Sequence, residues 1–218
     1  MSWSSGKDSA FALYVLSQSS TYEVTGLFTT VTEAYARVSM HGVREVLLDQ
    51  QAARLGLPLY KAHIPAPCPN KIYEEKMAGL VQAAQGEGVE AMAFGDLFLE
   101  DIRAYRIQRL EGTGIEPLFP IWGWETGDLA QEMLRVGLGT VITCVDEKKL
   151  LPTFSGRRFD EGFLSDLPED VDPCGENGEF HSFVYNHPLY SERIPWTLGE
   201  RVSRDGFTFA DVLPAEAE

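Results

Sequence analysis

Cysteine is scarce in this chain, which has only Cys68, Cys144 and Cys174 among its 218 residues. These cysteines are odd in number, widely scattered and without a paired spacing. The sequence therefore indicates neither a disulfide framework nor a zinc ribbon. We expect three free thiols.

Long apolar runs and targeting segments are also missing. No stretch approaches the roughly 20 apolar residues that cross a bilayer. The N-terminus lacks the basic and apolar regions of a secretory signal peptide. We expect a cytoplasmic protein with no membrane partner.

Positive charge is the third deficit. The chain has 18 Lys and Arg against 33 Asp and Glu, which gives a formal net charge of -15. Such a chain repels phosphate backbones, so nucleic acid is not an expected partner. The length and the 44% hydrophobic content suffice for one substantial domain with a large core. The oligomeric state stays open, a homo-oligomer included.

Strand and helix patterns alternate along most of the chain. A helical stripe begins at Phe11, and the later segments follow in turn. Strands are expected at residues 22–28, 59–64, 90–94 and 140–145, and helices at residues 43–56, 72–84, 100–110 and 128–136. This alternation predicts an α/β fold with a Rossmann-like, doubly wound parallel sheet, whose ligand loops lie at the carboxyl ends of the strands.

The character of the sequence changes at Leu151, after which glycine, proline and charge increase. Hairpins are expected at residues 180–185 and around Asp205-Gly206. We therefore divide the chain into a ligand-binding α/β domain at residues 1–150 and a small mixed C-terminal subregion at residues 151–218. The last residues, 215–218, are expected to fray.

The segment Ser4-Ser5-Gly6-Lys7-Asp8-Ser9 has the composition of an anion-binding turn that feeds directly into a helix. The first N–H groups of a helix lack partners and carry the positive end of its dipole, so phosphate is favoured there. Gly6 permits close approach, while the serine hydroxyls and the Lys7 ammonium add donors. The segment is not a Walker A loop, because Asp8 stands where that motif has a hydroxyl. A serine-rich helix cap is the simpler interpretation, but it explains neither Gly6 nor Lys7.

With Ser5 in place of the usual second glycine, this segment resembles the SGGKDS-type pyrophosphate loop of the N-type ATP pyrophosphatases. These enzymes belong to the adenine nucleotide alpha hydrolase-like superfamily. There the loop holds the β and γ phosphates of ATP while a substrate oxygen attacks the α phosphorus. The resemblance implies that residues 4–9 bind ATP, and that residues 1–150 form an ATP-binding domain.

Three further segments narrow the resemblance to the diphthine-ammonia ligase family. They are Arg37-Val38-Ser39-Met40-His41-Gly42, residues 95–106 beginning Gly95-Asp96, and residues 172–181. The family archetype adenylates the carboxylate of diphthine on elongation factor 2 and lets ammonia displace AMP to form an amide. The resemblance implies a C–N ligase that uses ATP and ammonia and releases AMP and pyrophosphate.

Two departures limit this transfer. Glu176-Asn177-Gly178-Glu179 stands where archaeal and eukaryotic ligases carry Glu-Gly-Gly-Glu, and it resembles the bacterial branch. Bacteria are not expected to make diphthamide, so elongation factor 2 is the expected acceptor only for an archaeal or eukaryotic chain, and otherwise the carboxylate substrate is unidentified. Relatives also place an apolar strand before the loop, whereas only Met1, Ser2 and Trp3 precede Ser4 here. Either that strand is very short or the natural chain begins earlier.

Carboxylates are the candidate metal ligands. Glu176 and Glu179 flank a glycine loop, where they could hold Mg²⁺ or orient ammonium, and Asp8 could approach the same metal. The alternatives are a solvated glycine turn for the two glutamates and a favourable helix start for Asp8. Asp96 follows a predicted strand end, where α/β folds expose catalytic groups.

Arg103, Arg106 and Arg109 recur at three-residue spacing along one side of a predicted helix. They could neutralise phosphate or an acidic substrate group, or they could form a solvated face that pairs with nearby acids. Arg103, Tyr105 and Arg106 lie in the matched segment and are expected to be functional, together with Gly95 on the nucleotide side. Arg109 is expected on the surface.

His41, Thr29 and Thr30 complete the expected nucleotide site. His41 could contact nucleotide or transfer a proton, although a lone histidine is often structural, and His181 is a similar case. Thr29 and Thr30 end a predicted strand in the region that frames adenine in related folds, or they reflect strand propensity alone. Cys174 with His181 is too small a set for zinc.

Three hypotheses remain open. The first is the amide-forming ligase, and the second keeps adenylation but changes the nucleophile, for example to sulfur. The lack of a Cys-x-x-Cys pair weakens the second. The third is a regulator that binds ATP without turnover and has no use for Glu176 and Glu179.

Overall fold

The computed structural model describes residues 1–38 and 41–216, so Ser39 and Met40 of the matched segment and the last two residues of the expected frayed tail lie outside the described residues. The helices are α1 (Lys7–Ser17), α2 (Glu45–Leu55), α3 (Asn70–Gly86), α4 (Glu100–Leu110), α5 (Thr126–Arg135) and α6 (Glu161–Ser165), with short 3-10 turns η1 (Glu33–Tyr35) and η2 (Pro152–Phe154). The strands are β1 (Leu27–Thr32), β2 (Arg37–Val38), β3 (Leu59–Ile64), β4 (Ala91–Ala93), β5 (Glu116–Leu118), β6 (Gly139–Asp146), β7 (Phe180–Asn186), β8 (Trp196–Arg204) and β9 (Phe207–Pro214).

Most of the expected elements are confirmed. The predicted bounds of β3 and α4 match, and α2, α3, β4, α5 and β6 differ by a few residues at their ends. Gly56 takes a left-handed conformation and ends α2, as a glycine after a helix is expected to do. Asp205-Gly206 forms the turn between β8 and β9, and the three cysteines are free thiols.

Two expectations are wrong. The strand expected at residues 22–28 begins only at Leu27, where pairing with Leu59 of β3 starts, and it continues to Thr32. Residues 22–26 instead lie in the connection from α1 to the start of β1. The hairpin expected at residues 180–185 is instead one continuous strand, β7, because no turn residue interrupts it and it pairs along β6.

Residues 1–3 occupy the centre of the parallel sheet. The Trp3 N–H donates to the Phe28 carbonyl at 2.8 Å, and the Ser2 N–H donates to the Ala93 carbonyl at 2.8 Å. This segment therefore joins the β2-β1-β3 sheet to the β4-β5 sheet. In chain order the parallel segments run third, second, first, fourth, fifth across the sheet, which is the order of a doubly wound fold. Its crevice lies where residues 1–3 meet β4.

Helices cover both faces of this sheet. Successive side chains of a strand point to opposite sides, so apolar residues of β1 are buried on each face. Leu27 and Val31 face the core that includes residues of α1 and α2. Phe28 faces the other way, into a second cluster with Val81 of α3 and Leu110 of α4. This arrangement confirms the predicted α/β fold.

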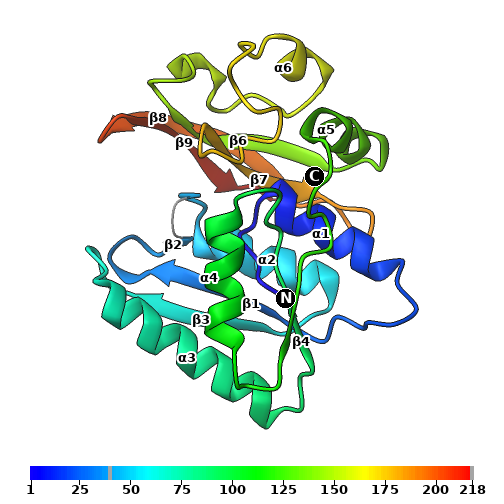
Figure 1. Cartoon of the computed structure of the whole chain (residues 1–218). Helices are drawn as coiled ribbons and strands as arrows, with labels where there is room; N and C mark the ends of the chain where they lie inside the picture. Colours follow the sequence, from blue (N-terminus) through cyan, green and yellow to red (C-terminus); the bar gives the residue numbers. More distant parts are fainter. Residues whose placement is uncertain (39–40, 217–218) are drawn as a thin grey trace.

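The C-terminal strands form a separate antiparallel sheet in the order β7-β6-β9-β8. Figure 1 shows this sheet above the parallel one, with α1 beneath β7. The side chain of Gln51 on α2 joins the two layers. Its Oε1 accepts from Trp3 at 2.8 Å, and its Nε2 donates to the carbonyls of Ser5 at 3.0 Å and Val184 at 2.7 Å. The buried amide is thus satisfied, and it fixes the start of the chain against β7.

Within the described residues, no helix combines the length and the apolar content needed to cross a membrane.

Candidate functional site

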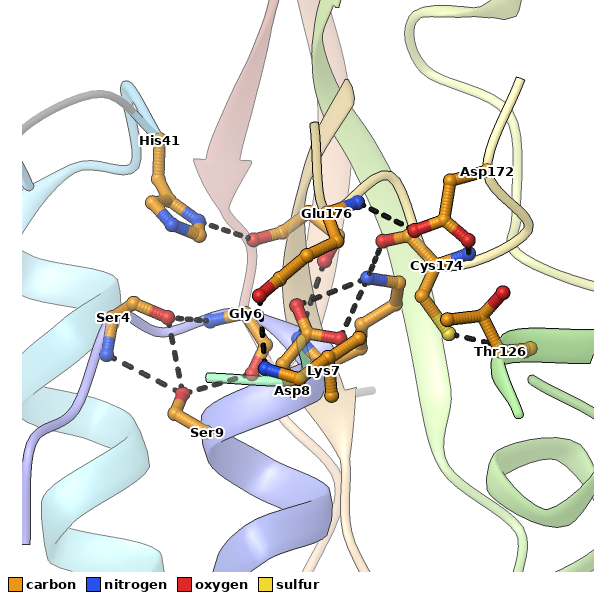
Figure 2. A network of polar contacts seen from close by, with 12 residues as sticks. Ser4, Gly6, Lys7, Asp8, Ser9, His41, Thr126, Asp172, Cys174 and Glu176 are labelled. Atoms are coloured by element: carbon orange, nitrogen blue, oxygen red, sulfur yellow. Dashed lines mark hydrogen bonds and ion pairs between the residues drawn. The ribbon is translucent and has the colours of Figure 1, made fainter. Parts of the chain in front are cut away.

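The loop of residues 4–9 runs directly into the N-terminus of α1. Gly6 is the residue before the first helical turn and supplies no side-chain cap, and the Lys7 N–H of that turn donates to the hydroxyl of Ser182 on β7. The Ser9 hydroxyl donates to the Gly6 carbonyl at 3.0 Å, and the Gly6 N–H donates to the Ser4 hydroxyl at 3.3 Å (Figure 2). The serine hydroxyls therefore shape the loop, while the positive end of the α1 dipole suits an anion.

Ser5 stands where the resembling motif has glycine, and its backbone shows why glycine is usual. Its φ is 69°, in the left-handed region, and its buried Oγ has no hydrogen-bond partner among the described residues. A side chain in this conformation costs of order 1 kcal/mol, and an unsatisfied buried hydroxyl adds to that cost.

We therefore expect Ser5→Gly to raise the free energy of unfolding by about 1 kcal/mol. Chemical denaturation monitored by circular dichroism measures the change. Ser203→Gly on exposed β8 is the control and is expected to destabilise, because glycine in a strand loses backbone entropy without relieving strain. A Ser5→Gly variant that is less stable than the wild type would refute this account of the loop.

Two glycines allow the walls of the site to close on the loop. A Cβ on Gly6 would lie 2.7 Å from Cε1 of His41 and 3.2 Å from the Ser182 carbonyl. A Cβ on Gly95, just after β4, would lie 2.9 Å from the Ser9 nitrogen. Both positions require glycine because other segments pack directly against their backbones.

Gly6→Ala is expected to push His41 and β7 away from the loop and to weaken nucleotide binding at least about tenfold, which corresponds to 1.4 kcal/mol. Equilibrium binding of an uncleavable ATP analogue measures the affinity. Gly79→Ala in α3 is the matched control, because a Cβ there meets nothing within 4 Å and alanine favours a helix. Unchanged affinity in a folded Gly6→Ala variant would contradict the assignment of residues 4–9 as the phosphate-binding loop.

A cavity of about 220 Å³ opens over this loop at the carboxyl end of β4. The main parts of the chain that meet there are residues 4–9, which we call the phosphate loop, the segment after β4, and the glycine loop that leads into β7, with single residues from α4 and from the segment after β2. The lining residues are Ser2, Ser4, Lys7, Asp8, Ser9, His41, Phe94, Gly95, Asp96, Arg106, Gly175, Glu176, Gly178, Phe180, His181 and Ser182. We call this space the phosphate cavity. A larger cavity of about 470 Å³, which Tyr22 and Tyr60 help to line, has glutamates but no lysine or arginine in its lining.

Lys7 is a buried cation at the wall of the phosphate cavity. Its side chain is 2% exposed, and its Nζ lies 2.8 Å from Asp8 Oδ1 and also donates to the Cys174 carbonyl. Burial works to lower the pKa of Lys7, but Asp8 and other nearby negative groups outweigh it and raise that pKa. Lys7 therefore stays charged and connects the phosphate loop to the C-terminal glycine loop, as Figure 2 shows.

Glu176 enters the phosphate cavity from the glycine loop. Its Oε1 accepts from the Leu97 N–H at 2.8 Å. Burial, together with the charges of Asp8 and Asp96, raises the pKa of Glu176 to about 7, against the hydrogen bond from Leu97 and the charge of Lys7. Burial raises the pKa of Asp96 as well, although Arg106 opposes the shift. Carboxyl groups with raised pKa values in a cleft are typical of sites that bind cations or transfer protons.

Glu179, expected beside Glu176, does not line the phosphate cavity. Its side chain is 3% exposed, and its Oε1 accepts from the Asp172 N–H at 3.2 Å and from the Asn177 amide at 3.0 Å. Its Oε2 is buried without a hydrogen-bond partner in the part of the chain that the structure describes.

Within residues 1–38 and 41–216, no group of three or more His, Cys, Asp and Glu side chains is arranged to hold a metal.

The three arginines of α4 have different surroundings. Arg106 lines the cavity, with its Nε 3.5 Å from Asp96 Oδ2 and its guanidinium 5.0 Å from the centre of the Phe94 ring. This is an ion-pair distance, but neither atom forms a hydrogen bond with good geometry to a described residue. Arg103 stacks instead on Trp122, at 4.7 Å, outside the cavity lining. Arg109 pairs with Glu74 at 2.7 Å, away from the phosphate loop.

Of the remaining candidate residues, some line the phosphate cavity and others do not. His41 and Gly95 line the cavity, and Ser182 is a residue that the sequence did not single out. The Ser182 hydroxyl accepts from the Lys7 N–H at 3.2 Å. Side chains alternate along β7, so Ser182 lies on the same side as Phe180. This alternation was the feature of the sequence that could have predicted Ser182 as a lining residue. Thr29 and Thr30 lie on β1, and neither lines the cavity.

A helix N-terminus over parallel strands in this order, with a phosphate-type loop before it, defines a class: α/β proteins with the fold of the PP-loop ATP pyrophosphatases. Within that class, the chain belongs to the diphthamide synthase family. The family model for the diphthamide synthase N-terminal domain matches residues 1–115, and the model for the C-terminal domain matches residues 125–211.

Curated relatives agree with the family models. A protein of Bos taurus named diphthine-ammonia ligase is 27% identical over 194 residues, which cover 82% of this chain and 70% of the relative. Proteins of the same name from Homo sapiens and Danio rerio are each 26% identical, over 82% and 76% of this chain and 70% and 71% of the relatives, respectively.

Proposed function

We propose that this chain binds ATP in the phosphate cavity and transfers AMP to a substrate carboxylate, so that ammonia can displace the AMP and form an amide. The observation that carries the proposal is the convergence of the loop at Gly6–Ser9 with two carboxylates, Asp8 and Glu176, over one cavity. Membership of the diphthamide synthase family and the name of the relatives support a ligase that uses ATP and ammonia.

The phosphate loop would hold the β and γ phosphates. The dipole at the start of α1 favours negative charge, and the buried Lys7 ammonium adds a positive field nearby. Arg106 would neutralise the α phosphate or the acceptor carboxylate, since its Nε is unsatisfied beside the cavity. Arg103 would act by positioning, because its contacts are with aromatic rings.

Magnesium fits the donor set on one side of the cavity. Mg²⁺ in nucleotide sites takes one or two carboxylates, with phosphate oxygens and waters completing its shell. Asp8 and Glu176 would supply the two carboxylates, so a set of three or more protein ligands is not required. Bound there, the ion would neutralise phosphate charge. Glu179 would act by holding the glycine loop in shape through Asp172 and Asn177.

Adenylation solves the chemical difficulty of amide formation. Ammonia attacks a carboxylate poorly, because oxide is a poor leaving group and the negative charge repels nucleophiles. In an acyl adenylate, AMP is the leaving group. The phosphate cavity would shield this intermediate from bulk water on the sides that the phosphate loop, the segment after β4 and the glycine loop line.

The experiment supplies α-labelled ATP, ammonia and fractions of cell extract to the full chain and identifies the products. The proposal predicts AMP and pyrophosphate, formed only with an active fraction and ammonia, and loss of both with Lys7→Ala. Release of ADP and phosphate would refute the proposed bond cleavage. A regulator without turnover would bind ATP and release no product with any fraction. A different nucleophile would show as pyrophosphate release that does not depend on ammonia.

A further inference from the structure

Two histidine rings form one wall of the phosphate cavity, and the chemistry proposed above assigns no role to either. His41 follows β2, and His181 lies on β7, with ring centroids 4.7 Å apart. The His41 ring lies so close to the phosphate loop that a Cβ on Gly6 would be 2.7 Å from its Cε1. A phosphate group on the loop amides beside Gly6 would therefore meet the His41 ring.

Ser182 determines which nitrogen of His41 can exchange a proton. His41 Nδ1 lies 3.2 Å from the Ser182 carbonyl. A carbonyl oxygen only accepts, so Nδ1 carries the hydrogen of the neutral ring and donates it to Ser182. Nε2 then keeps its lone pair and is the nitrogen that can take up a second proton.

The surroundings keep His41 neutral until an anion arrives. Burial lowers the pKa of His41 and the charge of Lys7 adds to this shift, while the hydrogen bond to the Ser182 carbonyl and the charge of Asp8 oppose it. These two charges come from α1, Glu176 faces the cavity from the glycine loop, and His181 from β7. Beyond His41, Arg37 donates to the Gly42 carbonyl and pairs with Asp211 at 2.9 Å. An anion in contact raises the pKa of a cationic acid by roughly 1–3 units, so a bound triphosphate would favour the charged ring near neutral pH.

We propose that His41 takes up a proton when the triphosphate binds and donates it to pyrophosphate as that group leaves. The inference rests on the proposed function and deepens it by assigning a general acid. An acceptor oxygen bonds to the α phosphorus, and the bond from that phosphorus to the bridging oxygen breaks. The electron pair stays on the bridging oxygen, to which the Nε2 proton of His41 moves. His41 is then neutral, and water supplies a new proton when the next nucleotide binds.

Proton uptake is measured with α,β-methylene-ATP, which cannot be cleaved at the bond in question. The analogue is titrated into the full chain at pH 7 in two buffers of different ionisation enthalpy, and the difference in heat gives the number of protons taken up. The wild type is expected to take up at least about half a proton more than His41→Asn. The asparagine amide can still donate to the Ser182 carbonyl but lacks Nε2. His63→Asn, at a histidine 42% exposed on β3, is the matched control and should behave like the wild type.

Pyrophosphate release provides the second readout. With a stimulating extract fraction, His41→Asn is expected to release pyrophosphate about 100-fold more slowly, as for loss of a general acid, with analogue affinity changed less than about threefold. His41→Gln serves as a second variant without an imidazole if the asparagine variant does not fold.

Equal proton uptake by the wild type and a folded His41 variant, with both binding the analogue, would overturn the assignment and leave the proposed function intact. A wild type that binds no ATP analogue would refute the proposed function and this inference together.

Discussion

Lys7→Met is expected to lower the free energy of unfolding by about 3 kcal/mol and to weaken ATP binding about 100-fold. The side chain of Lys7 is 2% exposed, so its removal leaves Asp8 and the Cys174 carbonyl without the cation that both contact. Asp8 is 24% exposed and partly solvated, which holds the loss at the lower end of the range for a broken buried pair. Denaturant unfolding and equilibrium binding of an ATP analogue measure the two effects.

Two further variants separate the structural from the functional part of this loss. Lys7→Met combined with Asp8→Asn removes the unpaired charge, so about half of the stability should return while ATP binding stays weak. Lys71→Met removes a lysine that is 87% exposed and should leave both properties unchanged. Normal ATP affinity in a folded Lys7→Met protein would contradict the assignment of residues 4–9 as the phosphate-binding loop.

Glu176→Gln is expected to reduce adenylation by about 100-fold and to remove its dependence on pH near neutrality. The raised pKa of Glu176, about 7, means that the group is neutral below pH 7 and ionised above it. If the ionised form holds a cation for the reaction, wild-type activity rises as the pH passes from 6 to 8. Glutamine can still accept from the Leu97 N–H but never ionises, so the residual activity of the variant should be flat over this range.

The free energy of unfolding of the wild type should fall over the pH range in which its activity rises. An acid whose pKa rises on folding costs stability once it ionises, and that cost is complete above pH 7 and absent below the unfolded value of 4.5. Glu176→Gln should therefore be more stable than the wild type at pH 8, by about 1–2 kcal/mol after allowance for partial solvation, and equally stable at pH 4. Glu75→Gln, at a glutamate 65% exposed, is the control for both measurements. A wild-type rate that falls between pH 6 and 8 would refute this role.

The phosphate loop was the feature most accessible from the sequence. Gly6 and Lys7 stand beside a helical stripe, and local chemistry alone links such a turn to the start of a helix. The predicted bounds of β3 and α4 were also correct, because Pro58 and Pro65 flank β3 directly and Gly112 follows closely after α4. The family resemblance also singled out Asp96 and Glu176, which are more than 70 residues apart in the chain. The structure places both in the lining of the phosphate cavity.

Features that depend on pairing between distant segments were not accessible. The start of β1 is set by its register with Leu59 of β3 and not by its own apolar residues, so the predicted strand began too early. Glu179 is three residues from Glu176 but turns inward to Asp172 and Asn177, a difference that depends on the backbone of the glycine loop. Ser182 reaches the Lys7 amide only because β7 packs over α1.

The most direct test of this account is a crystal structure of the chain with α,β-methylene-ATP and Mg²⁺. We expect the β and γ phosphates on the amides at Gly6–Ser9, within the cavity that Asp8 and Glu176 line. A triphosphate bound elsewhere, with residues 4–9 free of ligand, would contradict the account.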